Sequence, residues 1–189
     1  MVQVTDMTGG DAVILDPQIL LDTLGVAVAT GGEFAEVFVE DRRSISALLD
    51  DRRIEELTSG RDRGAGIRVV VGETTGFAHT ADLSPAGLRA AATAASAAAR
   101  SGGSGVRVVA LDSMSGPASA AVEILPSDVP KARKVALLER ADDAARSRDG
   151  AITQVTARYA DSQRRIQIAN SDGLLTGDRQ IRTLFSVSC

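Results

Sequence analysis

Few residues of this chain could do chemistry, and their spacing limits what that chemistry can be. Gly64-Ala65-Gly66 has the first two glycines of a dinucleotide-binding loop. Such a loop needs a third glycine at position 69, followed by a helix whose N-terminus holds the pyrophosphate. Position 69 is Val, and the surrounding residues predict a strand. The spacing therefore excludes a nucleotide loop and favours glycines at the mouth or bulge of a hairpin.

The single histidine, His79, lacks the neighbours that a metal or acid-base site needs. Zinc sites draw several His, Cys or carboxylate ligands around one point, and Asp82 is the only carboxylate close to His79 in the sequence. Ser84 follows, but no arrangement of the Ser-His-Asp type results. We expect His79 to be a surface residue at the end of a hairpin.

Adjacent carboxylates and the lone cysteine give no active site either. Neighbouring side chains lie about 100° apart on a helix and on opposite faces of a strand, so neither Glu55-Glu56 nor Asp142-Asp143 converges on one point. Cys189 could be a reactive thiol, but its alternation with Val187 and Phe185 predicts a small core residue. We therefore assign no catalytic residue, no metal ligand and no cofactor to these 189 residues.

Composition narrows the class of protein. The chain of 189 residues is 44% hydrophobic and 3% aromatic, without Trp, so its core must be aliphatic. A net charge of -4 argues against nucleic acid as a direct partner. We expect the basic pairs at 42–43, 52–53 and 164–165 to be solvated. One cysteine permits no internal disulfide, and neither a signal peptide nor a membrane-spanning run is present, which predicts a soluble cytoplasmic protein without a membrane partner.

The pattern of elements begins with a flexible leader at 1–15 and then a helix. Asp16-Pro17 is an N-cap followed by a proline at the first helical position, and Gly31-Gly32 ends the helix. Period-two alternation then predicts five strands, at 34–40, 45–49, 53–58, 67–71 and 75–79, with turns at Asp50-Asp51 and Gly72-Glu73. Short connections make this an antiparallel meander.

The second half adds helices and more strands. Ser84-Pro85 opens an alanine-rich helix that ends near Arg100. Residues 101–118 form a flexible connection and an internal boundary. A short strand at Val122–Leu125 and a helix from Pro130 follow, the helix presenting Val135, Leu138, Ala141 and Ala145 on one face. Strands at 151–159, 166–168 and 181–189 follow, with a hairpin turn at 170–173. The fold class is α+β, a largely antiparallel β-meander sheet with two to three helices packed on it.

Four segments carry a resemblance to a known family. They are EFAEVFVEDRRS from Glu33, RGAGIRVVVGETTGFAHTADLS from Arg63, KVALLERAD from Lys134 and IANSDGLL from Ile168. In this order they resemble the N-terminal domain of the TldD/PmbA family over residues 16–189, and Gly76-Phe77-Ala78 resembles the TldD branch. The final strand stops in mid-pattern at Cys189, and we expect a polypeptide truncated before a C-terminal metallopeptidase domain.

The resemblance implies a function that this chain cannot perform alone. Family members are cytoplasmic zinc metallopeptidases that cleave small unfolded peptides, with an older association with modulation of DNA gyrase. A TldD-type subunit pairs with a PmbA/TldE-type subunit. Their zinc ligands, in a His-Glu-x-x-x-His motif and a distant cysteine, belong to the C-terminal domain. His79 and Cys189 match neither, so the resemblance implies no catalytic or metal residue here and an isolated chain that is inactive.

Two functions remain open. The chain is either the substrate-enclosing and subunit-pairing half of such a peptidase, pairing with a PmbA/TldE-type subunit or with itself, or a free-standing binding or assembly module. In the first case the glycine-rich hairpin permits close approach of a peptide or partner backbone. Alternatively, its glycines serve only the hairpin's own geometry. The residues expected to contact a peptide or partner are Arg63, Gly64, Gly66, Arg68, Thr75, Gly76 and Phe77.

Overall fold

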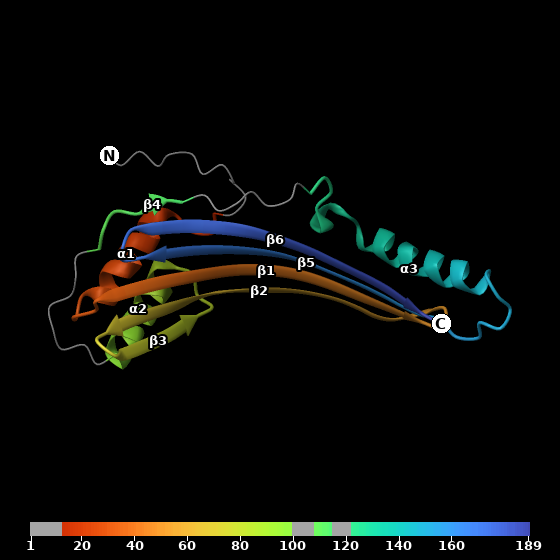
Figure 1. Ribbon diagram of the computed structural model, residues 1–189, viewed down its shortest axis with the longest axis horizontal. Helices are drawn as coiled ribbons and strands as arrows, with labels where there is room; N and C mark the ends of the chain where they lie inside the picture. The colour runs from red at the N-terminus through yellow and green to blue at the C-terminus, as the bar shows by residue number, and fades with distance from the viewer. Residues whose placement is uncertain (1–12, 100–107, 115–121) are drawn as a thin grey trace. The chain divides into compact units, whose positions relative to one another are not determined.

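A computed structural model describes residues 13–99, 108–114 and 122–189 (Figure 1). Most of the expected leader, and all of the expected boundary except 108–114, lie outside these ranges. The elements follow in the order α1 (Pro17–Val28), β1 (Phe34–Asp50), β2 (Arg53–Val71), β3 (Thr74–Thr80), α2 (Pro85–Ala98), β4 (Asp112–Ser113), the 3-10 turn η1 (Pro126–Asp128), α3 (Lys131–Arg146), β5 (Thr156–Asn170) and β6 (Leu174–Ser188).

The strands form one six-stranded sheet in the order β3-β2-β1-β5-β6-β4. Strand β2 pairs antiparallel with β3, and β4 pairs parallel with β6. Strand β5 lies antiparallel to β1, because Ser171 N–H donates to Ala35 O (2.9 Å) and Asp51 N–H donates to Val155 O (3.0 Å). Three helices and a mostly antiparallel sheet confirm the α+β prediction.

The long strands differ from the sequence prediction. The expected strands 34–40 and 45–49 are one strand, β1, and 53–58 and 67–71 are both part of β2. Apart from Ala65, the residues between the expected strands are polar or glycine, and β2 before Gly64 is exposed, so no buried alternation marks them as strand. The strand predicted at Val122–Leu125 was wrong, since this segment leads into η1 instead.

The chain divides into two compact units that do not follow chain order. Unit 1 comprises Met1–Asp41, Asp62–Ser119 and Arg165–Arg179, and unit 2 comprises Arg42–Arg61, Ala120–Arg164 and Gln180–Cys189. Strands β1, β2, β5 and β6 each contribute residues to both units.

Unit 1 has a core in which α1 and α2 pack on the sheet. Asp16 caps α1 by accepting from Gln18 N (2.7 Å), and Ser84 Oγ caps α2 by accepting from Gly87 N (3.2 Å), so both predicted helix starts are confirmed. Helix α2 lies beside β3, and α1 packs against α2 (Figure 1). The core is built of Leu20, Leu24 and Leu88, small residues of α2, and the alternating residues Ala35, Val37, Val39, Ala65, Ile67 and Val69.

Unit 2 has a smaller core beneath α3. Leu138 packs with Ala47, Leu49, Ala157 and Tyr159. The predicted apolar face of this helix was only partly right, because the fully buried positions are Lys134, Leu138 and Asp142. These positions are four residues apart and share one face, so two charged residues stand where Val135 and Ala141 were expected.

Cys189 is exposed, so its prediction as a core residue was wrong. Among the described helices, none is both long and apolar enough to cross a membrane.

Candidate functional site

The residues predicted to contact a peptide or partner lie on β2 and β3, but on two different faces. Antiparallel pairing sets Gly66 opposite His79 and Arg68 opposite Phe77. Because side chains alternate along a strand, these residues share the face that α1 and α2 leave uncovered. Phe77 is 62% exposed there, an unusual exposure for a large aromatic side chain.

Arg68 is engaged by neighbouring residues of β1. Its guanidinium lies 5.5 Å from the centre of the Phe34 ring, and Nη2 lies 3.5 Å from Glu36 Oε1. Both partners belong to the same uncovered face of the sheet. Arg68 is therefore directed across the sheet toward β1 by a cation–π contact and an ion pair.

A hollow of about 360 Å³ lies beside Phe77 on unit 1. Four of the predicted residues, Arg63, Gly64, Gly66 and Phe77, line it, whereas Arg68, Thr75 and Gly76 do not. The Phe77 and His79 rings are stacked with their centres 6.4 Å apart. The remaining walls come from strand residues and the end of the hairpin: Phe38, Glu40, Asp62, Ala65, Thr80 and Ala81. The hollow is the best-formed site among the predicted residues.

The three predicted glycines have different surroundings. A Cβ at Gly76 would overlap Ala95 O and lie 2.5 Å from Ala99 N, both on α2. A Cβ at Gly64 would lie 2.8 Å from Thr80 O of the paired strand. At Gly66 a Cβ would meet only the exposed Phe77 ring, at 3.1 Å. The chain's own packing thus accounts for Gly64 and Gly76, while Gly66 opens onto the hollow.

Unit 2 contains a buried charged cluster that the sequence analysis missed. Lys134 Nζ donates to Asp161 Oδ2 (2.5 Å) and to Pro126 O (2.9 Å), and lies 5.6 Å from the centre of the Tyr159 ring. The Lys134 and Asp161 side chains are 1% and 6% exposed. In the sequence, the sign of this cluster is the spacing of Lys134, Leu138 and Asp142, which places all three on one face of the helix. An isolated sequence does not show that such a face is buried.

The phenol of Tyr159 has a pKa raised to about 12, first by burial and then by the hydrogen bond and charge of Asp161, with a hydrogen bond to Thr183 acting in the opposite direction. Because the folded-state pKa is higher, the protonated phenol adds to the free energy of unfolding. This contribution is complete below the unfolded-state pKa of about 10 and is lost as the pH rises from there toward 12. Tyr159 is the only tyrosine and there is no Trp. Tyrosinate absorbance should therefore rise with a midpoint near pH 12 in the folded chain and near about 10 in denaturant.

Asp161→Asn should lower that midpoint, because it removes the charge that opposes formation of tyrosinate. Asp143→Asn, at an exposed position of α3, is the matched control and should leave it unchanged. A native midpoint close to that of the denatured chain would contradict the predicted effect of burial and Asp161.

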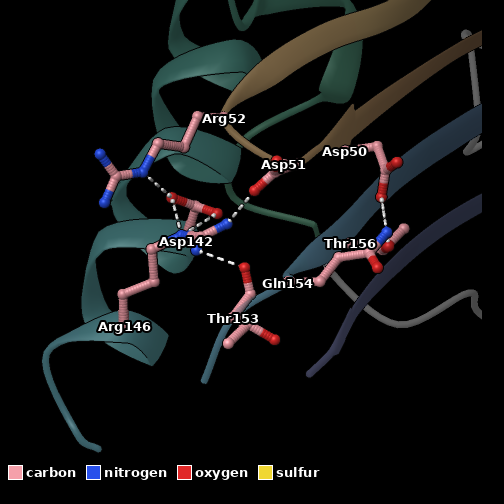
Figure 2. A network of polar contacts seen from close by, with 8 residues as sticks. All are labelled: Asp50, Asp51, Arg52, Asp142, Arg146, Thr153, Gln154 and Thr156. Carbon is pink, nitrogen blue, oxygen red and sulfur yellow. Dashed lines mark hydrogen bonds and ion pairs between the residues drawn. The ribbon is translucent and has the colours of Figure 1, made fainter. Parts of the chain in front are cut away.

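A second polar network holds the turn between β1 and β2 against α3 (Figure 2). Arg146 Nε donates to both Asp142 oxygens (3.1 Å each), Nη1 to Thr153 O (3.0 Å) and Nη2 to Asp51 Oδ1 (2.6 Å). Burial lowers the Arg146 pKa, but hydrogen bonds and charges of Asp142 and Asp51 outweigh it and raise the pKa. The chain turns at Asp51 and Arg52, whose φ angles are 43° and 69°. Such values are costly for residues other than glycine, so we assign this network a structural role.

The described residues do not fit a metal site. Among residues 13–99, 108–114 and 122–189, no group of three or more His, Cys, Asp or Glu side chains could hold a metal ion.

Two family models match the chain. One, described as PmbA/TldA metallopeptidase domain 1, matches residues 35–99, and the other, the PmbA/TldA metallopeptidase central domain, matches residues 124–189. The TldD metalloprotease homologue of Haemophilus influenzae is 29% identical over 175 residues, which cover 92% of this chain and 36% of the relative. That of Buchnera aphidicola is 30% identical over 156 residues, covering 82% and 32%. The chain thus spans about a third of the length of these relatives.

Solved structures share the fold. A candidate modulator of DNA gyrase from Thermotoga maritima has a TM-score of 0.69 at 18% identity, covering 89% of this chain and 38% of that one. A second candidate gyrase modulator, from Bacteroides thetaiotaomicron, has a TM-score of 0.68 at 16% identity, covering 93% and 41%. TldE from Thermococcus kodakarensis has a TM-score of 0.62 at 15% identity, covering 90% and 41%. Together the two family models account for most of the described residues, and the chain belongs to the PmbA/TldD metallopeptidase family.

Proposed function

We propose that this chain is the substrate-enclosing and subunit-pairing part of a cytoplasmic TldD-type zinc metallopeptidase that cleaves small unfolded peptides. The observation that supports it is the match to both domain 1 and the central domain of the family within one chain. In this proposal zinc and its ligands belong to the part of the enzyme outside these 189 residues, and a PmbA/TldE-type subunit is the partner.

The hollow beside Phe77 gives the proposal a specific place on unit 1. Phe77 offers an exposed ring, and Gly66 leaves the adjoining β2 surface free of a side chain. An apolar side chain of an unfolded peptide could pack on Phe77 and Phe38 while its backbone approaches Gly66. Arg63, Arg68 and Thr75 remain proposed contacts around this region, whereas Gly76 acts through its packing on α2.

The test compares the polypeptide encoded by the complete reading frame with the 189-residue chain, each with and without a PmbA/TldE-type subunit. The complete polypeptide with its partner should retain about one zinc per TldD-type subunit, by elemental analysis, and hydrolyse a labelled unfolded peptide. The 189-residue chain alone should do neither. Absence of hydrolysis by the complete pair would reject the peptidase assignment and favour a binding or assembly module.

Within the complete enzyme, Phe77→Ala should raise KM about threefold to tenfold with little change in kcat, because a buried aromatic contact contributes to binding rather than to the chemical step. Ile124→Ala is the control, since Ile124 is an apolar residue of comparable exposure (68%) outside the hollow. Equal KM values for both variants would reject the hollow as a peptide contact.

A further inference from the structure

Unit 2 carries a larger hollow, of about 940 Å³, that spans four strands. Its walls combine hydroxyl-bearing and small residues with two arginines, Arg42 of β1 and Arg182 of β6. The remaining lining residues are Ser44, Ile45, Ser46, Thr58, Ser59, Gly60, Ala160, Asp161, Ser162, Ile181, Thr183 and Leu184. All of them belong to unit 2.

Most residues that line this hollow occupy strand positions that point away from α3, and no residue of α3 lines it. Ala47 and Tyr159 pack with Leu138 of α3, so Ser46 and Ala160, each one residue away, point to the opposite face. Ser46 Oγ and Thr58 Oγ1 lie 2.6 Å apart there. Asp161 points toward α3, where Lys134 binds it. Asp161 lines the hollow, but its carboxylate pairs with Lys134 and its side chain is only 6% exposed.

The same alternation makes this face cationic. Arg42, Arg158, Arg164 and Arg182 occupy its even-numbered positions, where Asp50 and Glu56 are the acidic residues among the described strand positions. Both carboxylates are engaged by hydroxyl groups, Asp50 by Thr156 (2.6 Å) and Glu56 by Thr58 (3.1 Å). Over its whole sequence unit 2 has 14 basic and 11 acidic side chains, whereas unit 1 has 7 and 14.

Two of these arginines face each other across a strand pair. The backbone bonds Ser171–Ala35 and Asp51–Val155 share one register, which sets Arg164 of β5 opposite Arg42 of β1. The hydroxyl groups around them could donate hydrogen bonds to a bound carboxylate.

We propose that the uncovered face of unit 2 binds an acidic segment of an unfolded peptide, through carboxylates that pair with Arg42 and Arg182. The proposal rests on the proposed function and names the class of substrate that this site would favour. A peptide suits the site better than a nucleic acid, because the acidic excess of unit 1 disfavours a long polyanion, whereas a few carboxylates need to reach only one hollow.

The experiment measures fluorescence anisotropy of two labelled unstructured peptides of equal length on the 189-residue chain. One carries glutamates, and the other has glutamine at the same positions. The acidic peptide should bind about tenfold more tightly at low ionic strength, and added salt should reduce the difference. Arg42→Gln/Arg182→Gln should weaken its binding about fivefold to tenfold and leave the glutamine peptide unaffected.

The matched control is Arg133→Gln/Arg140→Gln, which removes the same charge from exposed positions of α3. It should change binding less than twofold, and circular dichroism should show both variants folded. Equal binding of the two peptides, or equal weakening by both double variants, would overturn the proposal. Tighter binding of a single-stranded oligonucleotide, or displacement of the peptide by millimolar inorganic phosphate, would overturn it in favour of a phosphate site.

The two proposals can fail separately. Loss of acidic-peptide preference, with zinc-dependent hydrolysis by the complete enzyme intact, would reject only the acidic site. Acidic-peptide binding by the chain without hydrolysis by the complete pair would reject only the peptidase assignment.

Discussion

Gly76→Val is expected to lower the free energy of unfolding of unit 1 by about 3 kcal/mol or more, because the new side chain has no space between β3 and α2. Its Cβ would overlap Ala95 O and lie 2.5 Å from Ala99 N. These are backbone atoms of a helix and cannot rotate away, so α2 must move off the sheet and expose Leu88 and its alanine neighbours. Amide hydrogen exchange should report the loss of protection in α2 and β3.

Gly66→Val is the matched control on the neighbouring strand. A Cβ there meets only the Phe77 ring, at 3.1 Å, and that ring is exposed enough to rotate. We expect a change below about 1 kcal/mol, the size usual for substitutions at exposed positions. Equal protection of α2 in the Gly76→Val variant and the unmodified chain would contradict the packing described for β3.

Lys134→Met is expected to destabilise unit 2 by about 3–5 kcal/mol, since it leaves the Asp161 carboxylate buried without its cation. The variant also removes a donor from Pro126 O and the cation over the Tyr159 ring. Urea unfolding followed by tyrosine fluorescence should measure the loss, because Tyr159 is the only tyrosine and lies in the unit 2 core.

Two comparisons separate charge burial from a general effect on α3. Lys131→Met, one turn earlier, removes an exposed lysine whose Nζ donates to Ser59 Oγ (2.9 Å), and should cost less than about 1 kcal/mol. Lys134→Met/Asp161→Leu should recover most of the lost stability, since it leaves neither charge unpaired. If the double variant is as unstable as Lys134→Met, the unpaired carboxylate is not the cause.

Much of the fold could be predicted because local signals were strong. Asp16-Pro17 and Ser84-Pro85 mark helix starts by capping chemistry that needs no distant partner. The turn at Gly72 was predicted from a residue suited to a positive φ, and its φ is 53°. The family resemblance, confirmed by the matches to both domain models, rested on four segments, one of which includes Gly72 and Ser84.

The parts that could not be predicted depend on contacts between distant residues. Residues 59–66 were expected to connect two strands, yet they belong to β2, because neighbouring strands supply hydrogen bonds that the hydrophobic pattern does not show. Arg165 was expected to be solvated, but its Nη2 lies 2.6 Å from the buried Asp41 Oδ2. The sequence does not show that Lys134 is buried, because its partner Asp161 lies 27 residues away along the chain.

The predicted contact residues show the same limit. They comprise one aromatic residue, one threonine, two arginines and three glycines, and these types do not show which face of the sheet each residue occupies. Register decides that Phe77 is open to solvent while Gly76, the residue before it, is pressed against α2. The face of a residue on an edge strand depends on where the helix lies, which period-two alternation alone does not specify.

Strands β1, β2, β5 and β6 supply residues to both units, which limits how the polypeptide can be divided into folded fragments. No single cut of the polypeptide separates the units, since unit 1 needs three stretches of sequence and unit 2 needs the three between and after them. A fragment limited to residues 35–99 would carry β1 without β5, the strand that follows it in the sheet order. Such a fragment would have a newly exposed backbone edge available for intermolecular pairing. Gene fragments that respect family-model limits are thus expected to self-associate, whereas residues 13–189 keep every described strand beside its partner.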